Sequence, residues 1–408
     1  MSITKLNEVL SNNVADLKLK GTAKGCEMVI TGIKHPSSGN GPRYLVDGYG
    51  NKEFIKMNSN SYLGLTLHPK MIAAEEKSAQ EFGTGPGAVR FISGTHRQHI
   101  ELEERLAKFH NRESAMIFSS AYVTSLGVLF PLCTKKTVFI SDALNHNCII
   151  QAMRLSRPAG KAVYKHNDMK DLEVQIQSWI GKADRVLAVT DGIFSMRGDN
   201  APLKEFVDIC EKYSHEFNEG IITIADDSHG AGGFGHTGRG TEEYCNTKVD
   251  ILIGTLGKAF GVNGGYVTSS KAITDYLRET APMYIYSNPI TVSEASASKQ
   301  AIDILDSSEG IKILSHLRKM TKRFDNGLTQ NGFETIKGDH PVVPLMVRDT
   351  QKTAELVNYL TDNGVLATGL NFPVVPKGDE EIRFQVNADH TEKDIDTVIG
   401  ILKRYQQN

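Results

Sequence analysis

Between residues 114 and 267 the sequence alternates short apolar segments with stretches of helical periodicity. The apolar segments are rich in Val, Ile and Leu, a composition typical of strands that are buried on both faces of a sheet. Strands are predicted at residues 115–118, 137–140, 163–165, 185–190, 221–225, 251–255 and 265–268. Helices are predicted between some of them, as at 171–180 and 203–217. This alternation predicts an α/β fold with a mostly parallel central sheet, in which ligands bind at the carboxyl ends of the strands.

The segments on either side of this region divide the chain into three expected parts. An N-terminal arm with a short hairpin at 44–54 is expected over residues 1–56, where Gly, Pro and Ser are frequent. A large ligand-binding domain is expected at 57–290, and a small C-terminal α/β domain at 291–408. Outside the central region, helices are predicted at 69–82, 97–110, 291–305 and 309–331, and strands at 343–347, 365–368 and 382–386.

The composition excludes several classes of function. A net charge of -2 over 408 residues gives no bulk attraction for nucleic acid or for an acidic membrane surface. No apolar run is long enough to span a bilayer, and no targeting signal is visible at the N-terminus. Five cysteines, Cys26, Cys133, Cys148, Cys210 and Cys245, are scattered without a C-x-x-C pair, so neither disulfides nor a zinc site is expected. These features predict a cytoplasmic protein.

One lysine follows a predicted buried strand directly. The segment DILIGTLGKAFG at 250–261 reads as an apolar strand, a tight turn and then Lys258. A lysine against apolar surroundings loses hydration, which lowers its pKa and makes the neutral amine available as a nucleophile toward carbonyl groups. Lys258 is therefore a candidate for Schiff-base formation, although most lysines beside glycine are solvated turn residues.

Two other strand ends carry ionisable side chains. The segment GIITIADDSHG at 220–230 ends in Asp226, Asp227 and His229. A carboxylate in this place is most often a cap or a turn residue. A functional role for Asp226 requires a cation, and a protonated pyridine nitrogen would supply one. His146, in SDALNHN, is either a hydrogen-bonded loop residue or a ring that lies on a flat cofactor.

Three further segments suit the recognition of anionic or phenolic groups. The segment MIFSSAYVTSL at 116–126 changes from strand to helix, and the free N–H groups of such a helix start suit a phosphate or ordinary capping. Ser195, in TDGIFSMRGD, either stabilises its turn or donates to a phenolic oxygen. Arg383, between apolar residues of a late strand, forms either a structural ion pair or a contact with a substrate carboxylate.

Two other motifs are rejected as binding sites. The pattern G-x-G-x-x-A at 83–88 follows a predicted helix rather than a strand, which is the wrong context for dinucleotide binding. His96 and His99 have no third ligand nearby in the sequence, so we expect them in a solvated helix start and expect no metal site.

Seven motifs, taken in order, resemble those of the α-oxoamine synthases, a branch of the fold-type I pyridoxal 5'-phosphate (PLP) enzymes. They are NSYLGL at 60–65, RFISGT at 90–95, SDALNH at 141–146, TDGIFSMRGD at 190–199, DDSHG at 226–230, GRG at 238–240 and GTLGKAFG at 254–261. The resemblance implies a fold-type I transferase with PLP in the large domain. It also implies an acyltransferase that joins an amino acid to an acyl-CoA, and a homodimer with its sites at the subunit interface.

The resemblance also implies roles for individual residues. Lys258 would form the Schiff base with PLP and move the α-proton, while Asp226 would hold the pyridine nitrogen. His229 and Ser195 would lie near the phenolic oxygen, and His146 would stack on the ring. The implied phosphate ligands are the backbone at Ala121 and Tyr122, Thr255, and Ser287 and Asn288 from the partner subunit. The implied amino-acid ligands are Asn60, His146 and Arg383.

The choice of substrates within the branch rests on two segments. GRGTEEYC at 238–245 and NFPVVPKGDEEIR at 371–383 most resemble the glycine C-acetyltransferases, which implies glycine and acetyl-CoA. Arg197, however, stands where an acidic residue is usual, in a segment expected to shape the acyl-CoA channel. The alternatives are therefore 8-amino-7-oxononanoate synthase, serine palmitoyltransferase, 5-aminolevulinate synthase, an inert partner subunit or a transaminase. The presence of Lys258 and Asp226 argues against an inert subunit, and NSYLGL argues against a transaminase.

Overall fold

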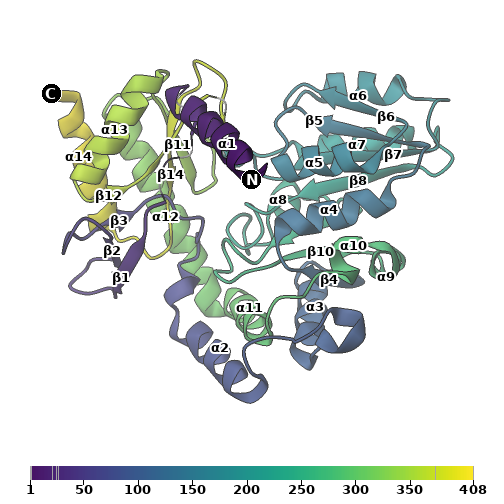
Figure 1. Cartoon of the computed structure of the whole chain (residues 1–408), viewed down its shortest axis with the longest axis horizontal. Coiled ribbons are helices and arrows are strands. Elements are labelled where there is room, and N and C mark those ends of the chain that lie inside the picture. The colour runs from purple at the N-terminus through teal and green to yellow at the C-terminus, as the bar shows by residue number, and fades with distance from the viewer. Residues whose placement is uncertain (1, 21, 24, 26, 373, 408) are drawn as a thin grey trace.

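The computed structural model describes the whole chain except residues 1, 21, 24, 26, 373 and 408, so Cys26 lies outside the described residues. Its largest sheet has seven strands in the order β4-β10-β9-β8-β7-β5-β6. They are β4 Ser114–Phe118, β5 Thr137–Asp142, β6 Gly160–Tyr164, β7 Arg185–Asp191, β8 Ile221–Asp226, β9 Ile251–Thr255 and β10 Gly265–Ser269. Every predicted strand of this region is present, and Figure 1 shows them as one sheet.

The sheet is mostly parallel, as predicted, with one strand reversed. Strands β5 to β9 pair in parallel, whereas β10 lies antiparallel between β9 and β4. The connection from β9 to β10, residues 256–264, contains no helix and is too short for the crossover that a parallel pair requires. The loop that carries Lys258 is therefore a tight antiparallel connection at the carboxyl end of β9.

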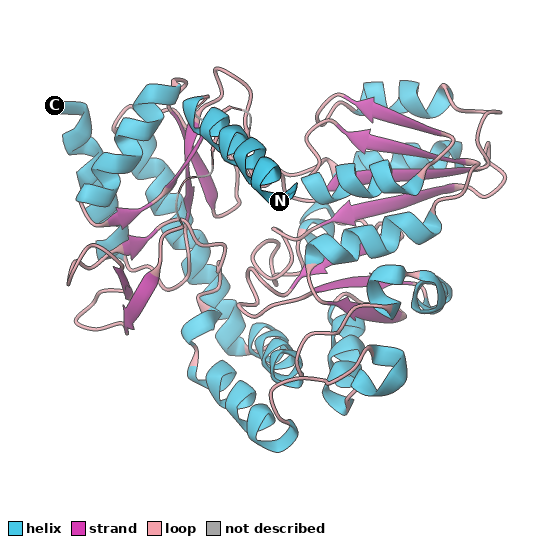
Figure 2. Cartoon of the chain, viewed as in Figure 1, coloured by secondary structure: helices cyan, strands magenta, loops and turns pink. Residues whose placement is uncertain are grey.

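Helices cover both faces of this sheet (Figure 2). On one face, α4 Ala121–Leu132, α5 Asn147–Ser156 and α9 Lys271–Thr280 contribute apolar side chains to a core with the strands. On the other face, α6 Met169–Gln177 and α7 Leu203–Ser214 do the same. Because apolar layers cover both faces, polar side chains can gather only at the strand ends. Shorter helices are α8 Thr241–Cys245 and α10 Pro282–Ile285.

A second lobe contains the C-terminal part of the chain (Figure 1). Its sheet has the order β11-β14-β13, with β11 Val342–Met346, β14 Glu381–Gln385 and β13 Thr368–Leu370. Its helices are α12 Ser308–Gln330, α13 Thr350–Asp362 and α14 Glu392–Gln407. The N-terminal segment joins this lobe, because β3 Ile55–Lys56 pairs in parallel with β12 Val365–Leu366. Among the described residues, no helix is both long and apolar enough to cross a membrane.

The N-terminal arm differs from its prediction. It begins with α1 Ser2–Leu19, followed by an antiparallel pair of β1 Ile30–Lys34 and β2 Arg43–Val46. The chain turns back at 44–54 as predicted, but the expected hairpin is reduced to one antiparallel bridge between Tyr44 and Phe54, and the longer pairing of β2 is with β1. The turn residues of that segment make the bend, but the segment Gly48 to Lys52 between them is too polar and Gly-rich to extend the pairing.

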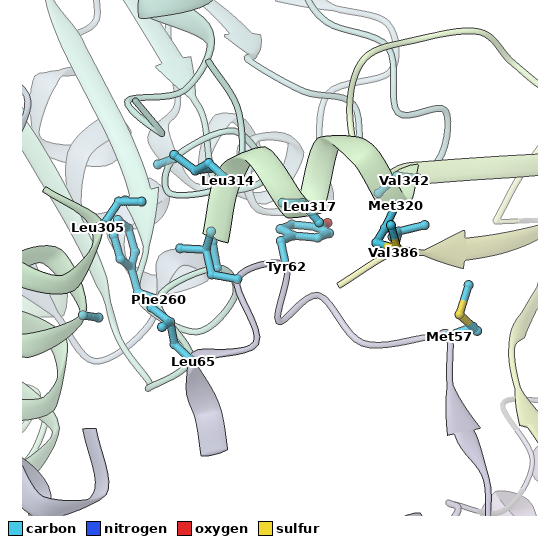
Figure 3. Close-up of a cluster of buried hydrophobic side chains, with 14 of the residues drawn as sticks. Met57, Tyr62, Leu65, Phe260, Leu305, Leu314, Leu317, Met320, Val342 and Val386 are labelled. Carbon is cyan, nitrogen blue, oxygen red and sulfur yellow. The ribbon is translucent and has the colours of Figure 1, made fainter. Parts of the chain in front are cut away.

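A large apolar core lies between the two lobes (Figure 3). It includes Tyr62, Leu65, Phe260, Leu305, Leu317, Met320, Val342 and Val386, all of which Figure 3 labels. The elements that contribute to it include η1 Leu65–Leu67, α2 Pro69–Phe82, α3 Arg97–Phe109 and α11 Val292–Leu305. The short segment η2 Arg90–Gly94 lies against α10 instead. The segment that contains Tyr62 therefore passes through the core rather than over the surface.

The prediction of a solvated helix start at His96 and His99 is wrong for His99. Its ring is fully buried, its Nδ1 accepts from the His96 backbone N–H at 3.1 Å, and its Nε2 lies 2.9 Å from the carbonyl oxygen of Ile290. Since Nδ1 is an acceptor, Nε2 carries the proton and donates to that carbonyl. His99 therefore ties the start of α3 to the chain before α11. The described residues contain no group of three or more His, Cys, Asp or Glu side chains that could hold a metal.

Candidate active site

A small cavity lies at the carboxyl ends of β5, β7 and β8, beside the starts of α4 and α5. It is lined by Ala121, Tyr122, His146, Cys148, Asp191, Ile193, Ser195, Asp226, Ser228, His229 and Lys258. The structure thus gathers most of the predicted site residues from segments that lie far apart in the sequence. Cys148, Asp191, Ile193 and Ser228 were not predicted.

Lys258 lies in the connection between β9 and β10, partly buried against the cavity wall. Burial is the main cause that lowers the pKa of its amine to about 8, and the nearby Asp226 carboxylate opposes that shift. The loop is compact because Val262 N donates to the Leu256 carbonyl at 3.0 Å and Gly261, at φ 73°, closes its turn. An appreciable fraction of the Lys258 amine is therefore neutral near pH 7 and able to act as a nucleophile.

Asp226 ends β8 and is held by three neighbouring side chains. Ser125 Oγ donates to its Oδ2 at 3.1 Å, Ser228 Oγ donates to its Oδ1 at 2.5 Å, and the Cys148 thiol lies 3.6 Å from Oδ2. The Ser228 backbone N–H adds a further bond to Oδ1 at 3.1 Å. Donors on both oxygens fix the orientation of the carboxylate.

Asp191 is a second buried carboxyl group of the site, and sequence reasoning missed it. It ends β7 directly opposite Asp226 in the parallel ladder, and its oxygens accept from the His146 backbone N–H at 3.2 and 3.4 Å. Burial raises the pKa of Asp191 well above its usual value, and the charge of Asp226 raises it further. Asp191 directly follows a predicted strand, as Asp226 does, so its position in the sequence could have identified it as a site residue.

His146 lies at the mouth of the cavity and begins α5. Its Nδ1 accepts from the Cys148 backbone N–H at 3.3 Å and lies 2.9 Å from the Cys148 sulfur, which fixes one edge of an exposed ring. Loss of hydration is the main cause that lowers the pKa of His146, with Asp226 opposing the shift. A neutral, solvent-facing imidazole held by one edge is suited to stacking on a flat ring.

The start of α4 offers backbone donors to an anion. Ser120 caps this helix by accepting from Val123 N at 3.3 Å, and within the described part of the chain no acceptor takes the N–H of Ala121 or Tyr122. Gly265 of β10 allows the close approach, since a Cβ there would lie only 2.4 Å from Ala121 N. Thr255, predicted as a phosphate ligand, lies outside the cavity lining and donates its hydroxyl to the Gly264 carbonyl at 3.2 Å.

The remaining predicted residues lie outside the cavity lining. Asn60 and Arg383 meet each other beside it, with Arg383 Nη2 donating to Asn60 Oδ1 at 3.2 Å. Ser287 and Asn288 follow α10. Ser287 is half-buried, Asn288 is exposed, and neither lines the cavity of its own chain. Their contribution to the site of a second subunit stays a prediction.

Comparison with known proteins gives the family. The sequence profile of the aminotransferase class I and II family matches residues 52–402. The 8-amino-7-oxononanoate synthase of Thermoanaerobacter pseudethanolicus is 38% identical over 92% of both chains. The mitochondrial 2-amino-3-ketobutyrate coenzyme A ligase of Bos taurus is 36% identical over 98% of this chain and 91% of its own. The structure of serine palmitoyltransferase from Sphingomonas wittichii matches with a TM-score of 0.88 at 26% identity, covering 99% of this chain and 98% of that one.

A variant of the Sphingomonas paucimobilis serine palmitoyltransferase, solved with bound PLP, matches with a TM-score of 0.87 at 26% identity over 99% of this chain and 98% of that one. The chain belongs to the α-oxoamine synthases, a branch of the aminotransferase class I and II family of PLP-dependent enzymes. The predicted fold-type I architecture and the predicted cofactor are thereby confirmed.

The residues of the cavity fit this cofactor. The Asp226 carboxylate would balance the charge of a cationic ring nitrogen, and Lys258 supplies an amine of lowered pKa in the same cavity. The open N–H groups at the start of α4 suit the phosphate.

Proposed function

We propose that this chain condenses an amino acid with the acyl group of an acyl-CoA, releasing CoA, with glycine and acetyl-CoA as the preferred pair. The observation that supports it most is the meeting of Lys258, Asp226, His146 and His229 in one cavity. When bound, PLP supplies the electron sink that stabilises a carbanion at the α-carbon of the amino acid. The chain supplies the nucleophile, the charges and the surfaces that orient the reactants.

Each group of the chain has a task that follows from its surroundings. Lys258, neutral in part near pH 7, would hold the cofactor through its aldehyde and accept the α-proton of the substrate. Asp226, oriented by Ser125 and Ser228, would hold a proton at the ring nitrogen. His146, which lines the same cavity, would stack on the ring. Arg383 and Asn60 receive the carboxylate of the amino acid.

The comparisons and two sequence segments leave two candidates for the substrates. The bovine 2-amino-3-ketobutyrate coenzyme A ligase aligns with 98% of this chain, and the segments at 238–245 and 371–383 resemble that group. The second candidate is an 8-amino-7-oxononanoate synthase, favoured by the 38% identity of the Thermoanaerobacter enzyme. Arg197, which pairs with Asp199 at 3.1 Å and is partly exposed, belongs to the segment we expect to contact the acyl chain.

A substrate panel distinguishes these candidates. Release of CoA is measured with glycine, alanine and serine, each paired with acetyl-CoA, with a dicarboxylic acyl-CoA and with palmitoyl-CoA. We expect the highest kcat/KM for glycine with acetyl-CoA, at least ~10-fold above every other pair, because one mismatched methylene already costs 10-fold or more. Activity with another pair and none with this one would contradict the glycine and acetyl-CoA assignment while leaving the reaction class intact.

We also propose that the protein is a cytoplasmic homodimer. Phe91, Ile92 and Tyr286 are 66%, 68% and 78% exposed, and Tyr286 directly precedes Ser287 and Asn288. Apolar side chains this exposed are typical of surfaces that a partner covers. The described cysteines, Cys133, Cys148, Cys210 and Cys245, are free, which fits a reducing compartment.

The dimer is tested by light scattering on the purified protein. We expect twice the mass of one chain for the native sequence and a shift toward the monomer in Phe91→Asp, because an interface that buries a charge loses affinity. An exposed apolar residue elsewhere, Val174 on α6, provides the control variant Val174→Asp, which should remain dimeric. A native protein that is monomeric at micromolar concentration would refute the proposal.

A further inference from the structure

A chain of hydrogen bonds connects the small lobe to the cavity. Arg383 Nη2 on β14 donates to Asn60 Oδ1 at 3.2 Å. The Tyr62 hydroxyl lies 3.3 Å from the same Asn60 oxygen and 2.7 Å from Nδ1 of His229. His229 lines the cavity. Three parts of the sequence, at 60–62, 229 and 383, thus share one continuous polar connection.

Tyr62 is held rigidly within this connection. Its ring is fully buried in the apolar core between the lobes, close to Leu317 and Met320 of α12 (Figure 3). The Ala388 backbone N–H donates to the Tyr62 carbonyl at 2.8 Å, which fixes the main chain as well. The hydroxyl is therefore a polar group in apolar surroundings, and its position leaves it two acceptors, Asn60 Oδ1 and His229 Nδ1.

The main chain of His229 is held by a hydrogen bond from the ring of His340. The Val342 backbone N–H donates to Nδ1 of His340 at 3.1 Å, so Nε2 of His340 carries its proton and donates to the His229 carbonyl at 2.9 Å. Burial lowers the pKa of His229 well below its usual value, and the charge of Lys258 adds to this, so the ring is neutral. The only freedom left to a neutral ring in a fixed position is which nitrogen carries the proton.

The Tyr62 hydroxyl decides between these two forms. When it donates to His229 Nδ1, the His229 Nε2 carries the proton; when it donates to Asn60, it accepts from Nδ1–H and Nε2 becomes an acceptor. While Arg383 donates to Asn60 Oδ1, the shorter 2.7 Å contact favours donation to His229. A carboxylate that draws Arg383 away would leave Asn60 Oδ1 without that donor, and it would then compete for the Tyr62 proton.

We propose that Tyr62 is a positioning residue that, together with Asn60, couples the binding of a carboxylate at Arg383 to the side of the His229 ring that carries the proton. The inference rests on the proposed function, since it takes the amino-acid carboxylate as the ligand of Arg383. Through this coupling, the hydrogen bond that His229 offers to the cofactor would change only after a substrate has bound.

The test is nitrogen NMR on the holoenzyme labelled with ¹⁵N-histidine, with the His229 signals assigned from a His229→Gln variant. Glycine without acyl-CoA is expected to shift the native His229 from the Nε2–H form toward the Nδ1–H form. In Tyr62→Phe and Asn60→Ala this response is expected to vanish, and Tyr62→Phe is expected to lower kcat by about 10-fold with KM changed less than ~3-fold. An unchanged response in Tyr62→Phe, or none in the native protein, overturns the proposal.

Tyr266→Phe is the matched control. It removes a buried hydrogen bond of the same kind, between the Tyr266 hydroxyl and Nε2 of His110 at 2.9 Å, outside the cavity lining. We expect a similar loss of thermal stability but an unaltered His229 response. Because the NMR measurement needs no acyl-CoA and no turnover, absence of CoA release in the substrate panel would count against the proposed function alone.

Discussion

Replacing Lys258 with alanine is expected to abolish the visible absorption band of the purified protein and to lower CoA release by roughly three orders of magnitude or more. Lys258 is the only amine that lines the cavity described here, and its pKa of about 8 makes it the nucleophile of the site. Borohydride treatment followed by peptide mass spectrometry should locate the cofactor on Lys258 in the native protein and on no peptide in the variant.

The matched control is Lys271→Ala, which removes an exposed lysine that pairs with Asp275 on α9. This variant should keep the absorption band and full turnover, because surface pairs of this kind contribute little. Cofactor attached covalently to another lysine in the Lys258→Ala protein would contradict the assignment. The rate at which the cofactor-free native protein captures PLP should also rise with pH through about 8 and then level off, because only the neutral amine reacts.

The fold was largely predictable because its strands are apolar throughout and separated by helices. The direction of β10 was also predictable, because the connection at 256–264 is too short for a parallel pair. The order in which strands lie side by side was not predictable from the sequence. The pairing of β2 with β1 rather than with the segment near Phe54 depends on packing against the rest of the lobe, which no local pattern encodes.

In the site, too, some residues could be predicted from the local sequence and others could not. Asp226, His146 and Lys258 follow strands and were found as strand-end residues. Asp191 meets the same criterion, yet its importance depends on β7 lying beside β8 in register, a relation between strands that one sequence does not specify. Tyr62 and Asn60 reach His229 and Arg383 across separations of 167 and 323 residues. Hydrogen bonds over such distances follow from the three-dimensional packing and have no local signature in the chain.

The adjacent carboxylates Asp226 and Asp227 allow chemistry to be separated from structure. Asp227 is fully buried, accepts from Thr241 N at 2.7 Å and from Thr241 Oγ1 at 2.6 Å, and does not line the cavity. Asp227→Ala removes the acceptor of both Thr241 donors and leaves a buried N–H group unpaired, so we expect it to lower the free energy of unfolding by about 1–3 kcal/mol. In the fraction that stays folded, the cofactor spectrum should be unchanged.

Asp226→Asn should show the reverse behaviour. The hydroxyls of Ser125 and Ser228 can rotate to accept from an amide, so the fold and part of the cofactor binding should survive. Turnover should nevertheless fall by about 10²- to 10⁴-fold, because a neutral side chain no longer keeps a proton on the ring nitrogen. Asp226→Glu retains the charge and should recover part of that loss if the longer side chain still reaches the ring. Turnover in Asp226→Asn that equals the native value, measured by CoA release at matched cofactor occupancy, would show that the charge of Asp226 does not drive the reaction.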